Sequence, residues 1–343
     1  MSAPHNEVSN PRFAAIDCGT NSIRLLISER TPDGQINELN RDNIIVRLGQ
    51  GVDATGRFAD EALQRVDDAL QIYADRMVDY GVVDVMMGAT SATRDAANRE
   101  EFFDITRRHL GRVREGAVAK VISGEQEAEL SFRGAVTDLP GAAERTVCVI
   151  DLGGGSTEFV VHGPGREPQA FSANMGCVRL TERFLHDQPP TQQQIDDARS
   201  FVEELMEQVR SHVDLRAVDQ VVGVAGTMTT LTALTLGLSE YEPERIHMAT
   251  LPLEDFRATA RTLLGLTPQQ RCEYGPMHPG RADVIGGGSI VVDAFTSRFL
   301  DWGLSEITIS EKDILDGMLA EVMARPLSVS YTHLRAHETR EDL

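Results

Sequence analysis

The chain has little cysteine and no long apolar run. Its four cysteines, Cys18, Cys148, Cys177 and Cys272, are far apart and form no Cys-x-x-Cys pair. A disulfide framework or a zinc site is therefore not expected, and a reduced, cytoplasmic setting is favoured. No apolar stretch is long enough to span a bilayer, and the first residues lack the basic and apolar regions of a signal peptide. We therefore expect no membrane partner.

Positive charge is also scarce. The chain has 33 lysines and arginines against 53 aspartates and glutamates, and its formal net charge is -20. Such a surface does not favour nonspecific binding to nucleic acid, which needs an excess of positive charge. A small polyanion can still bind where local positive groups overcome the repulsion by the whole protein. We therefore expect no nucleic-acid partner, but a polyanionic ligand remains compatible with the composition.

The composition is that of a globular protein, with 41% hydrophobic and 25% charged residues, and 343 residues are enough for two domains. Strand-like runs alternate with helix-like runs, which favours an α/β architecture. Strands are expected within 13–27, 44–52 and 147–161, and the glycine run at 286–288 is expected within or beside a helix. The segment 326–343 lacks periodicity and resembles a translated sequencing adapter, so we exclude it from the fold as a non-native, disordered tail.

Two segments carry clear helix signals. After Asp60, apolar residues recur at approximately helical spacing, and Gly81 stands where a C-terminal cap is expected. Thr191 and Gln194 have the spacing of a capping box at the start of another helix. The apolar face expected for the first of these helices comprises Leu63, Val66, Leu70 and Val78.

Two further stretches share one plan. The sequences FAAIDCGTNSIRLLI and VIDLGGGSTEFVV each lead from apolar residues into an aspartate and then a glycine turn. Glycines let backbone N–H groups approach a phosphate, hydroxyl groups add hydrogen bonds, and an aspartate can hold Mg²⁺. One such loop is explained equally well by a β-hairpin with a glycine turn as by phosphate binding. Two similar loops, however, are unlikely to arise by accident. The expected phosphate cradle comprises Gly19, Thr20, Asn21, Ser22, Gly153, Gly154, Gly155 and Ser156, with Asp17 and Asp151 as metal-side carboxylates.

This duplication resembles the actin-like phosphotransferase fold, in which two RNase H-like domains bring phosphate loops to a shared cleft. Within that superfamily the chain most resembles the exopolyphosphatase and guanosine pentaphosphate phosphohydrolase family in its short, two-domain form. The resemblance implies a first domain at 1–124, a second at 125–310, and a closing helix at about 311–325 that packs back on the first. The segments that carry it are AIDCGTNSIRLLI, GATSATRDAANREEF, VISGEQEAELSFRGA, VIDLGGGSTEFV, NMGCVRLTERF, GVAGTMTTLTAL and RADVIGGG.

The resemblance assigns catalytic roles to two glutamates. Glu127 matches the family's catalytic glutamate, which orients and deprotonates the attacking water. Glu125 and Glu129 lie nearby, and from the sequence alone all three could form a solvated helix face. Glu158 is implied as a second catalytic or metal-linked carboxylate, with an outward-facing strand residue as the alternative.

Further residues are expected to bind phosphate. Arg94 follows a loop of small hydroxylated residues that includes Ser91, and its planar fork suits phosphate oxygens; a surface arginine at a helix start is the alternative. Arg24 could equally contact phosphate or form a salt bridge. Gly226 and Thr227 lie where nucleotide-using relatives bind adenosine and could form another phosphate loop, and RADVIGGG offers Arg281 similarly.

The function that the resemblance implies is exopolyphosphatase activity, the Mg²⁺-dependent (or Mn²⁺-dependent) hydrolytic release of terminal phosphate from inorganic polyphosphate. Hydrolysis of guanosine pentaphosphate to the tetraphosphate is the main alternative. An ATP-dependent kinase of the same superfold and a non-catalytic alarmone sensor are weaker alternatives, and the presence of both Glu127 and Glu158 argues against the sensor. The family often forms dimers, so a homodimer is one expected state.

Overall fold

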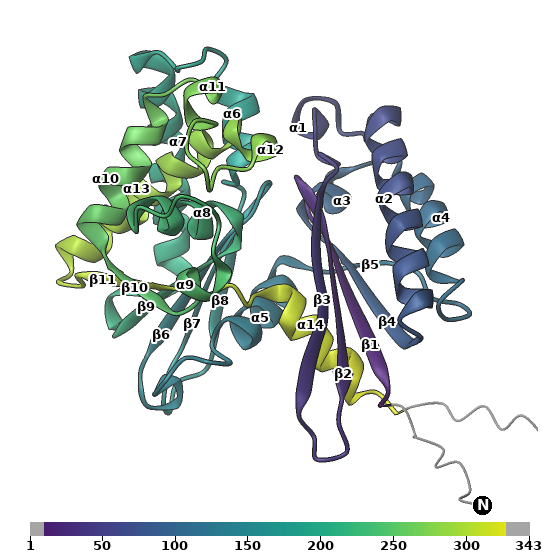
Figure 1. The fold of residues 1–343 in the computed structure, drawn as a ribbon. Coiled ribbons are helices and arrows are strands. Elements are labelled where there is room, and N and C mark those ends of the chain that lie inside the picture. Colours follow the sequence, from purple (N-terminus) through teal and green to yellow (C-terminus); the bar gives the residue numbers. More distant parts are fainter. Residues whose placement is uncertain (1–9, 327–343) are drawn as a thin grey trace, which may run out of the picture.

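The first lobe of the molecule is built on a five-stranded sheet. The computed structural model describes residues 10–326, which form two lobes (Figure 1). The strands of the first lobe are β1 (Arg12–Cys18), β2 (Ser22–Arg30), β3 (Ile36–Ile45), β4 (Val82–Ala89) and β5 (Lys120–Val121). Their order is β3-β2-β1-β4-β5; β1, β2 and β3 form an antiparallel meander, and β4 and β5 run parallel to β1.

The second lobe repeats this plan with one strand added. Its strands are β6 (Val147–Leu152), β7 (Thr157–His162), β8 (Gln169–Ala173), β9 (Gln220–Val224), β10 (Ala249–Pro252) and β11 (Glu306–Ile309). The order is β8-β7-β6-β9-β11-β10; β6, β7 and β8 are an antiparallel meander, β9 and β11 run parallel to β6, and β10 is an antiparallel edge. The predicted pair of related α/β domains is thereby confirmed.

The helix expected after Asp60 is present as the longest helix of the first lobe. Its helices are α1 (Val52–Thr55), α2 (Asp60–Asp79), α3 (Ser91–Asp95) and α4 (Arg99–Leu110), and α2 and α4 share the core of one sheet face. Gly81 follows α2 in a left-handed conformation, with φ of 65°, as its capping role requires. Val78, however, was wrongly placed in the buried face of α2: it is 48% exposed. Met77, which lies seven residues after Leu70 and so nearly in line with it, is buried instead.

The strand predicted at 44–52 is also misplaced. The strand is β3, which begins at Ile36 and ends at Ile45, and 46–51 form a loop. β3 lies at the edge of the sheet and most of its residues are polar and partly exposed, so it carries no hydrophobic alternation. The apolar residues Val46 and Leu48 are buried, but they fill the core from the loop.

Glycine lets the helices of the second lobe pack closely. The run at 286–288 lies inside a helix, α13, where a Cβ on Gly288 would come within 2.7 Å of Thr227 Cγ2. The capping box of Thr191 and Gln194 is present at the start of α7. The helices of this lobe are α6 (Cys177–Phe184), α7 (Gln192–His212), α8 (Ala225–Thr235), α9 (Pro243–Ile246), α10 (Leu253–Leu264), α11 (Pro268–Arg271), α12 (Pro279–Ala282) and α13 (Ile285–Asp301).

Two helices, α5 (Gly124–Ala135) and α14 (Ile314–Ala324), lie between the sheets (Figure 1). α14 follows β11 of the second lobe and packs on the first sheet, where its apolar side chains share a core with Phe13 and Met86. α5 packs on the second sheet. The two helices cross at Gly134 and Gly317, where an added Cβ would overlap the backbone oxygens of Asp313 and Leu130.

Gly317→Ala should therefore destabilise the protein although alanine is the better helix former. Forcing a methyl group into closely packed backbone costs about 1–3 kcal/mol, which offsets the roughly 1 kcal/mol that alanine contributes to an exposed helix. Urea unfolding should show a clearly lower midpoint for Gly317→Ala. Glu321→Ala, an exposed change on the same helix, should stay within about 0.5 kcal/mol of the wild type. A Gly317→Ala midpoint at or above the wild-type value would contradict this packing.

No helix within 10–326 is both long and apolar enough to cross a bilayer. The tail expected from 326 onward lies outside the described residues except for Pro326, and so do residues 1–9.

Candidate active site

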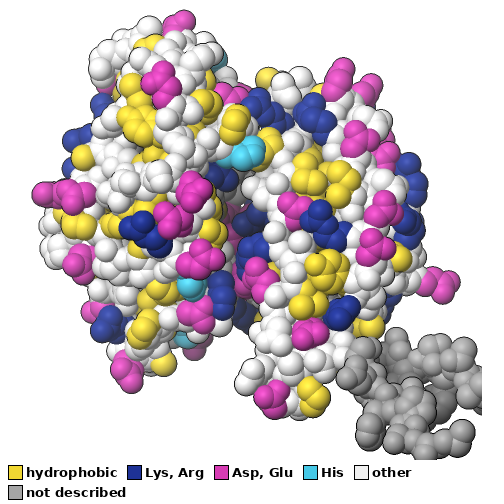
Figure 2. All heavy atoms as spheres, in the orientation of Figure 1, with side chains coloured by type: hydrophobic (Ala, Val, Ile, Leu, Met, Phe, Trp, Pro, Cys, Tyr) yellow, Lys and Arg dark blue, Asp and Glu magenta, His cyan; other side chains and the backbone are white. Residues whose placement is uncertain are grey.

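A cleft of about 910 Å³ separates the two lobes. Figure 2 shows basic side chains gathered in the gap between the lobes. Arg24, Arg41, Arg281 and Lys312 are among the residues that line this cleft. The same cleft is lined by a larger number of carboxylates, and Arg24, Arg41 and Lys312 pair with carboxylates, so an anionic ligand there needs a cation in addition to these side chains.

Side-chain alternation brings both predicted aspartates to the centre of the molecule. Successive residues of a strand face opposite sides of a sheet, so Asp17 faces the same side as Phe13, which packs with α14. By the same rule Asp151 faces the side of Val147, which belongs to the core beside α5. Both carboxylates are therefore directed at the region where α5 and α14 cross, and each is 6% exposed.

The two glycine loops have the same local geometry. The Gly19 N–H donates to the Ser22 carbonyl at 2.9 Å, and the Gly153 N–H donates to the Ser156 carbonyl at 3.0 Å. The loops also touch across the cleft. A Cβ on Gly155 would lie 2.7 Å from Thr20 Oγ1, so this contact has no room for a side chain. All eight residues predicted for the phosphate cradle line the cleft.

Three carboxylates of the second lobe are buried together. Glu158 is 1% exposed and pairs directly with Asp151 in the β6–β7 register, so the two side chains lie on one face. The alternative of an outward-facing Glu158 is therefore wrong. Glu127, on α5, is 8% exposed, and Ser131, four residues later on the same helix, donates to Asp151 at 2.5 Å.

The pKa values of these carboxylates are all raised. Burial, and then the neighbouring Glu158, raise the pKa of Asp151 to about 8. Burial and Glu158 also hold the pKa of Glu127 well above its ordinary value, although Arg94 opposes the shift. Burial raises the pKa of Glu158, although a hydrogen bond from Ser172 opposes the shift. Such crowding of desolvated carboxyls is typical of functional sites, where a ligand or cation supplies the balancing charge.

Arg94 connects the first lobe to these carboxylates. Its Nη1 donates to Glu127 Oε2 at 2.7 Å and to the Ile122 carbonyl at 3.0 Å, and its Nη2 lies 3.5 Å from Ser156 Oγ. The alternative of a surface arginine at a helix start is wrong, because Arg94 is in the last turn of α3 and its side chain is 23% exposed. Ser91, at the start of α3, is buried and lines the cleft.

Arg24 forms salt bridges, one of the two alternatives left open by the sequence. Its Nε and Nη2 donate to Asp17 Oδ2 at 3.1 and 2.7 Å, and its Nη1 pairs with Asp313. Burial raises the pKa of Asp17 although Arg24 opposes the shift. Arg24 still lines the cleft, so its charge also acts on a ligand there.

The predicted metal-side carboxylates fit a hard divalent cation only in part. Asp17 Oδ1 is buried without a hydrogen-bond partner, which leaves a free oxygen ligand, and Asp151 offers a second carboxylate nearby in the same cleft. Within 10–326, however, no group of three or more potential metal-ligating side chains is assembled. Mg²⁺ commonly uses one or two carboxylates and completes its shell with water and substrate phosphates. The donor set therefore fits Mg²⁺ if substrate oxygens and water supply the remaining ligands.

The cleft is also lined by the other predicted anion-binding group. Gly226 and Thr227 are in the first turn of α8, whose N-cap has no side-chain hydrogen bond. Arg281 packs against Gly226 and donates to Thr230 Oγ1 at 2.6 Å. Burial lowers the pKa of Arg281, and no carboxylate of the described residues lies within ion-pair distance of it. The guanidinium is thus available to an anion.

Sequence reasoning missed two residues at this site. Asp313 caps α14 and pairs with Arg24. Its capping-box spacing with Asp316 indicates the start of a helix but does not indicate a place in the site. Arg179 of α6 contacts Gly155 and Ser91, and no local pattern distinguishes it from a surface arginine.

Comparisons with known proteins find relatives that match nearly the whole chain. A model of the Ppx/GppA phosphatase family matches residues 26–325. Exopolyphosphatase 2 of Mycobacterium tuberculosis is 49% identical over 311 residues, which cover 90% of this chain and 97% of the relative.

Two solved structures are similar over nearly the whole chain. An exopolyphosphatase-like protein is 40% identical with a TM-score of 0.84, covering 91% of this chain and 97% of that one. A Ppx/GppA family member from Aquifex aeolicus is 29% identical with a TM-score of 0.74, covering 92% of this chain and 98% of that one.

Proposed function

This chain belongs to the Ppx/GppA phosphatase family, and on that premise we propose that it is an exopolyphosphatase. It hydrolyses the terminal phosphoanhydride bond of inorganic polyphosphate and releases orthophosphate. The observation that carries the proposal is the meeting, in one cleft, of two glycine loops of the same geometry with Glu127 and Asp151, while Glu158 is buried beside Asp151. The loops suit a phosphate chain, and the carboxylates suit activation of water.

The terminal phosphate is bound between the lobes. The backbone N–H groups and hydroxyls of the loops at 19–22 and 153–156 surround it, and Ser91 adds a hydroxyl. Arg94 presents a planar fork to the phosphate oxygens, and Arg24 contributes positive charge. Gly226, Thr227 and Arg281 line the same cleft and bind further phosphates of the chain.

Glu127 is the general base. It orients a water molecule and accepts its proton as the water oxygen bonds to the terminal phosphorus and the bridging P–O bond breaks, leaving a chain one phosphate shorter. The transition state of phosphoryl transfer is loose, so positioning and charge stabilisation dominate catalysis. A raised pKa makes Glu127 a better proton acceptor, and Arg94 holds its carboxylate in place. Glu158 is the second carboxylate of the site.

Asp17 and Asp151 would hold the divalent cation, which we propose to be Mg²⁺. When bound, the cation neutralises charge on the phosphate oxygens. Asp17 offers its unpartnered Oδ1, while Arg24 holds its other oxygen in place. Ser131 orients Asp151 from α5 through its hydrogen bond.

Two further parts of the proposal concern the chain as a whole. We place the domain boundary between 124 and 125 and assign α14 to the first domain, because its apolar face joins the core of the first sheet. We place the protein in the cytoplasm, where its four free cysteines would stay reduced.

The proposal is tested by measuring phosphate release from long polyphosphate, tripolyphosphate, guanosine pentaphosphate and ATP, each with and without Mg²⁺. We expect Mg²⁺-dependent release from long polyphosphate at a kcat/KM above that of the other three compounds. A higher kcat/KM for guanosine pentaphosphate would instead indicate that this site hydrolyses guanosine pentaphosphate to the tetraphosphate. Phosphate transfer from ATP that requires an acceptor would indicate a kinase and contradict the proposal.

Arg94→Ala should impair the enzyme more than Arg94→Lys. Lysine keeps the positive charge but loses the two-pronged fork, whereas alanine loses both and leaves Glu127 without its partner at 2.7 Å. We expect the alanine variant to show the larger rise in KM for polyphosphate and the larger fall in kcat, measured by steady-state phosphate release. Unchanged Michaelis constants in both variants would remove Arg94 from the phosphate site.

A further inference from the structure

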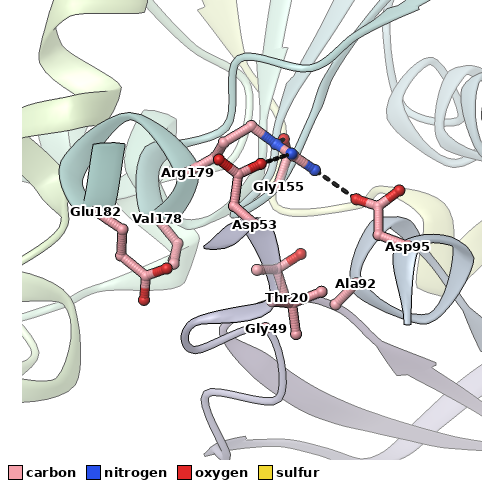
Figure 3. A pocket seen from close by; sticks show the side chains of 10 residues that line it. Thr20, Gly49, Asp53, Ala92, Asp95, Gly155, Val178, Arg179 and Glu182 are labelled. Carbon is pink, nitrogen blue, oxygen red and sulfur yellow. Dashed lines mark hydrogen bonds and ion pairs between the residues drawn. The ribbon is translucent and has the colours of Figure 1, made fainter. Parts of the chain in front are cut away.

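Arg179 joins the two lobes directly beside the phosphate loops. We propose that it is a positioning residue that clamps the loop at 153–156 of the second lobe to α3 of the first and so holds the cleft closed for reaction. The catalytic part of this inference rests on the proposed function, but the clamp itself rests on contacts alone. Figure 3 shows the guanidinium of Arg179 reaching from α6 toward Asp53 and Asp95, with Gly155 beside it.

One guanidinium binds four groups. Its Nε donates to the Gly155 carbonyl at 2.9 Å, and its Nη2 donates to Asp95 Oδ2 at 2.6 Å and lies 3.5 Å from Ser91 Oγ. Its Nη1 pairs with Asp53 of α1. The side chain is 13% exposed, so solvent screens these interactions less than it screens ordinary surface pairs.

The partners of Arg179 explain its effect on catalysis. Gly155 belongs to the second lobe, whereas Asp53, Ser91 and Asp95 belong to the first. Ser91 and Asp95 are the first and last residues of α3, the helix that carries Arg94. Arg179 therefore sets the position of α3 relative to the second phosphate loop, and with it the contact of Arg94 with Glu127.

Neighbouring contacts show that the lobes meet along a common rim. Glu182, almost one turn after Arg179, accepts a hydrogen bond from the Gly51 N–H at 3.1 Å. Arg47 pairs with Asp283 at 2.9 Å. These contacts join the segment at 47–53 or α3 to α6 or to the turn between α12 and α13, away from the crossing of α5 and α14 (Figure 1). The rim contacts are thus distinct from the crossing of α5 and α14.

Loss of Arg179 has a second consequence, which is electrostatic. Asp53 and Asp95 would then face the loops without a counter-charge, and they would repel a polyphosphate chain entering the cleft. The clamp therefore predicts both a lower kcat, from misplaced groups, and a higher KM, from this repulsion. A residue that merely stabilised its own lobe would change neither constant in the folded enzyme.

The test compares Arg179→Met, Arg179→Lys and the control Arg183→Met. Arg183 lies on the same helix, is exposed, and stacks on Phe184 and Phe201 of its own lobe, so its replacement removes the same charge without touching the rim. With polyphosphate we expect Arg179→Met to lower kcat/KM by on the order of 10- to 100-fold, as displacement of positioned groups does. Arg179→Lys should recover part of the loss, and Arg183→Met should match the wild type.

Hydrogen–deuterium exchange tests the clamp without any substrate. In Arg179→Met the Gly51 amide and its neighbours at 49–53 should exchange faster, while the amides of β1 and β6 should keep the wild-type rate and so show that both lobes are folded. Asp53→Asn/Asp95→Asn, which leaves the arginine in place, should show the same faster exchange if Arg179→Met does not fold. Wild-type exchange at 49–53 in both of these variants would overturn the clamp. If wild-type protein releases no phosphate from polyphosphate, the proposed function fails, yet the exchange comparison still decides the clamp.

Discussion

Glu127→Gln is expected to lower the turnover of polyphosphate by about 10²–10⁴-fold, the usual contribution of a positioned acid or base. Glutamine keeps the shape and the hydrogen-bonding capacity of the side chain, but it cannot accept the proton of the attacking water. The affinity for polyphosphate should hold or rise slightly, because one negative charge near the polyanion is gone. Steady-state phosphate release and a binding isotherm for polyphosphate measure the two effects separately.

The neighbouring glutamates provide matched controls. Glu125 and Glu129 are on the same helix but exposed, and Glu129 pairs with Arg133 on the helix surface. Glu125→Gln and Glu129→Gln should therefore stay within a small factor of the wild-type turnover.

Two outcomes would contradict the assignment of Glu127. If Glu127→Gln turns over normally while one of its neighbours is inactive, the match of SGEQEAEL to the family motif is wrong. If all three variants are active, the water is oriented from elsewhere, and Glu158 becomes the first candidate because it shares the buried cluster.

The parts of the site that follow strands could be predicted from the sequence. An aspartate before a glycine turn is a local signal, and its occurrence twice predicted two related sheets with facing loops. Strand alternation then explains why Asp17 and Asp151 both point at the central helices. The capping box at Ser123 and Gln126 similarly marks the start of α5, so the burial of Glu127 follows from helix register once the partner surface is known.

The remaining site residues depend on how the two lobes are placed against each other. Arg179 pairs with Asp53 and Asp313 pairs with Arg24, and in each pair the partners are more than a hundred residues apart in the sequence. No local sequence pattern indicates such contacts. Glu158 was ambiguous because every residue but the last of β7 is buried, so TEFVV shows no alternation from which to read its face. Its pairing with Asp151 and its hydrogen bond from Ser172 show which face it occupies.

Asp151→Asn should produce a defect of a different kind, which eases as Mg²⁺ is raised. Asparagine removes a carboxylate from the metal side of the site, so a lower cation affinity, by at least about 10–100-fold, is expected to limit turnover. Titrating activity against Mg²⁺ should shift the half-saturation point upward and restore much of the rate at high concentration. Glu127→Gln should show no such recovery, because its missing group takes a proton rather than a cation.

The same variant should change how stability depends on pH when EDTA removes divalent cations. In the folded protein Asp151 keeps its proton up to a pKa of about 8, whereas its ordinary value, expected in the unfolded chain, is 3.8. The folded state thus binds more protons between these values, and linkage makes its stability fall as pH rises through this window. Asparagine does not titrate, so Asp151→Asn should lose less stability between pH 5 and about pH 8.5 than the wild type.

Together the two measurements distinguish a metal-side carboxylate from a merely buried one. If Asp151 were buried but did not bind the cation, its replacement would weaken the pH dependence of stability. The Mg²⁺ dependence of activity would then stay as in the wild type. A metal-side Asp151 should change both, and added Mg²⁺ should raise the melting temperature of the wild type more than that of Asp151→Asn. If Mg²⁺ stabilises the two proteins equally, Asp151 is not a ligand of the cation. Asp17, whose Oδ1 has no hydrogen-bond partner, is then the remaining candidate ligand.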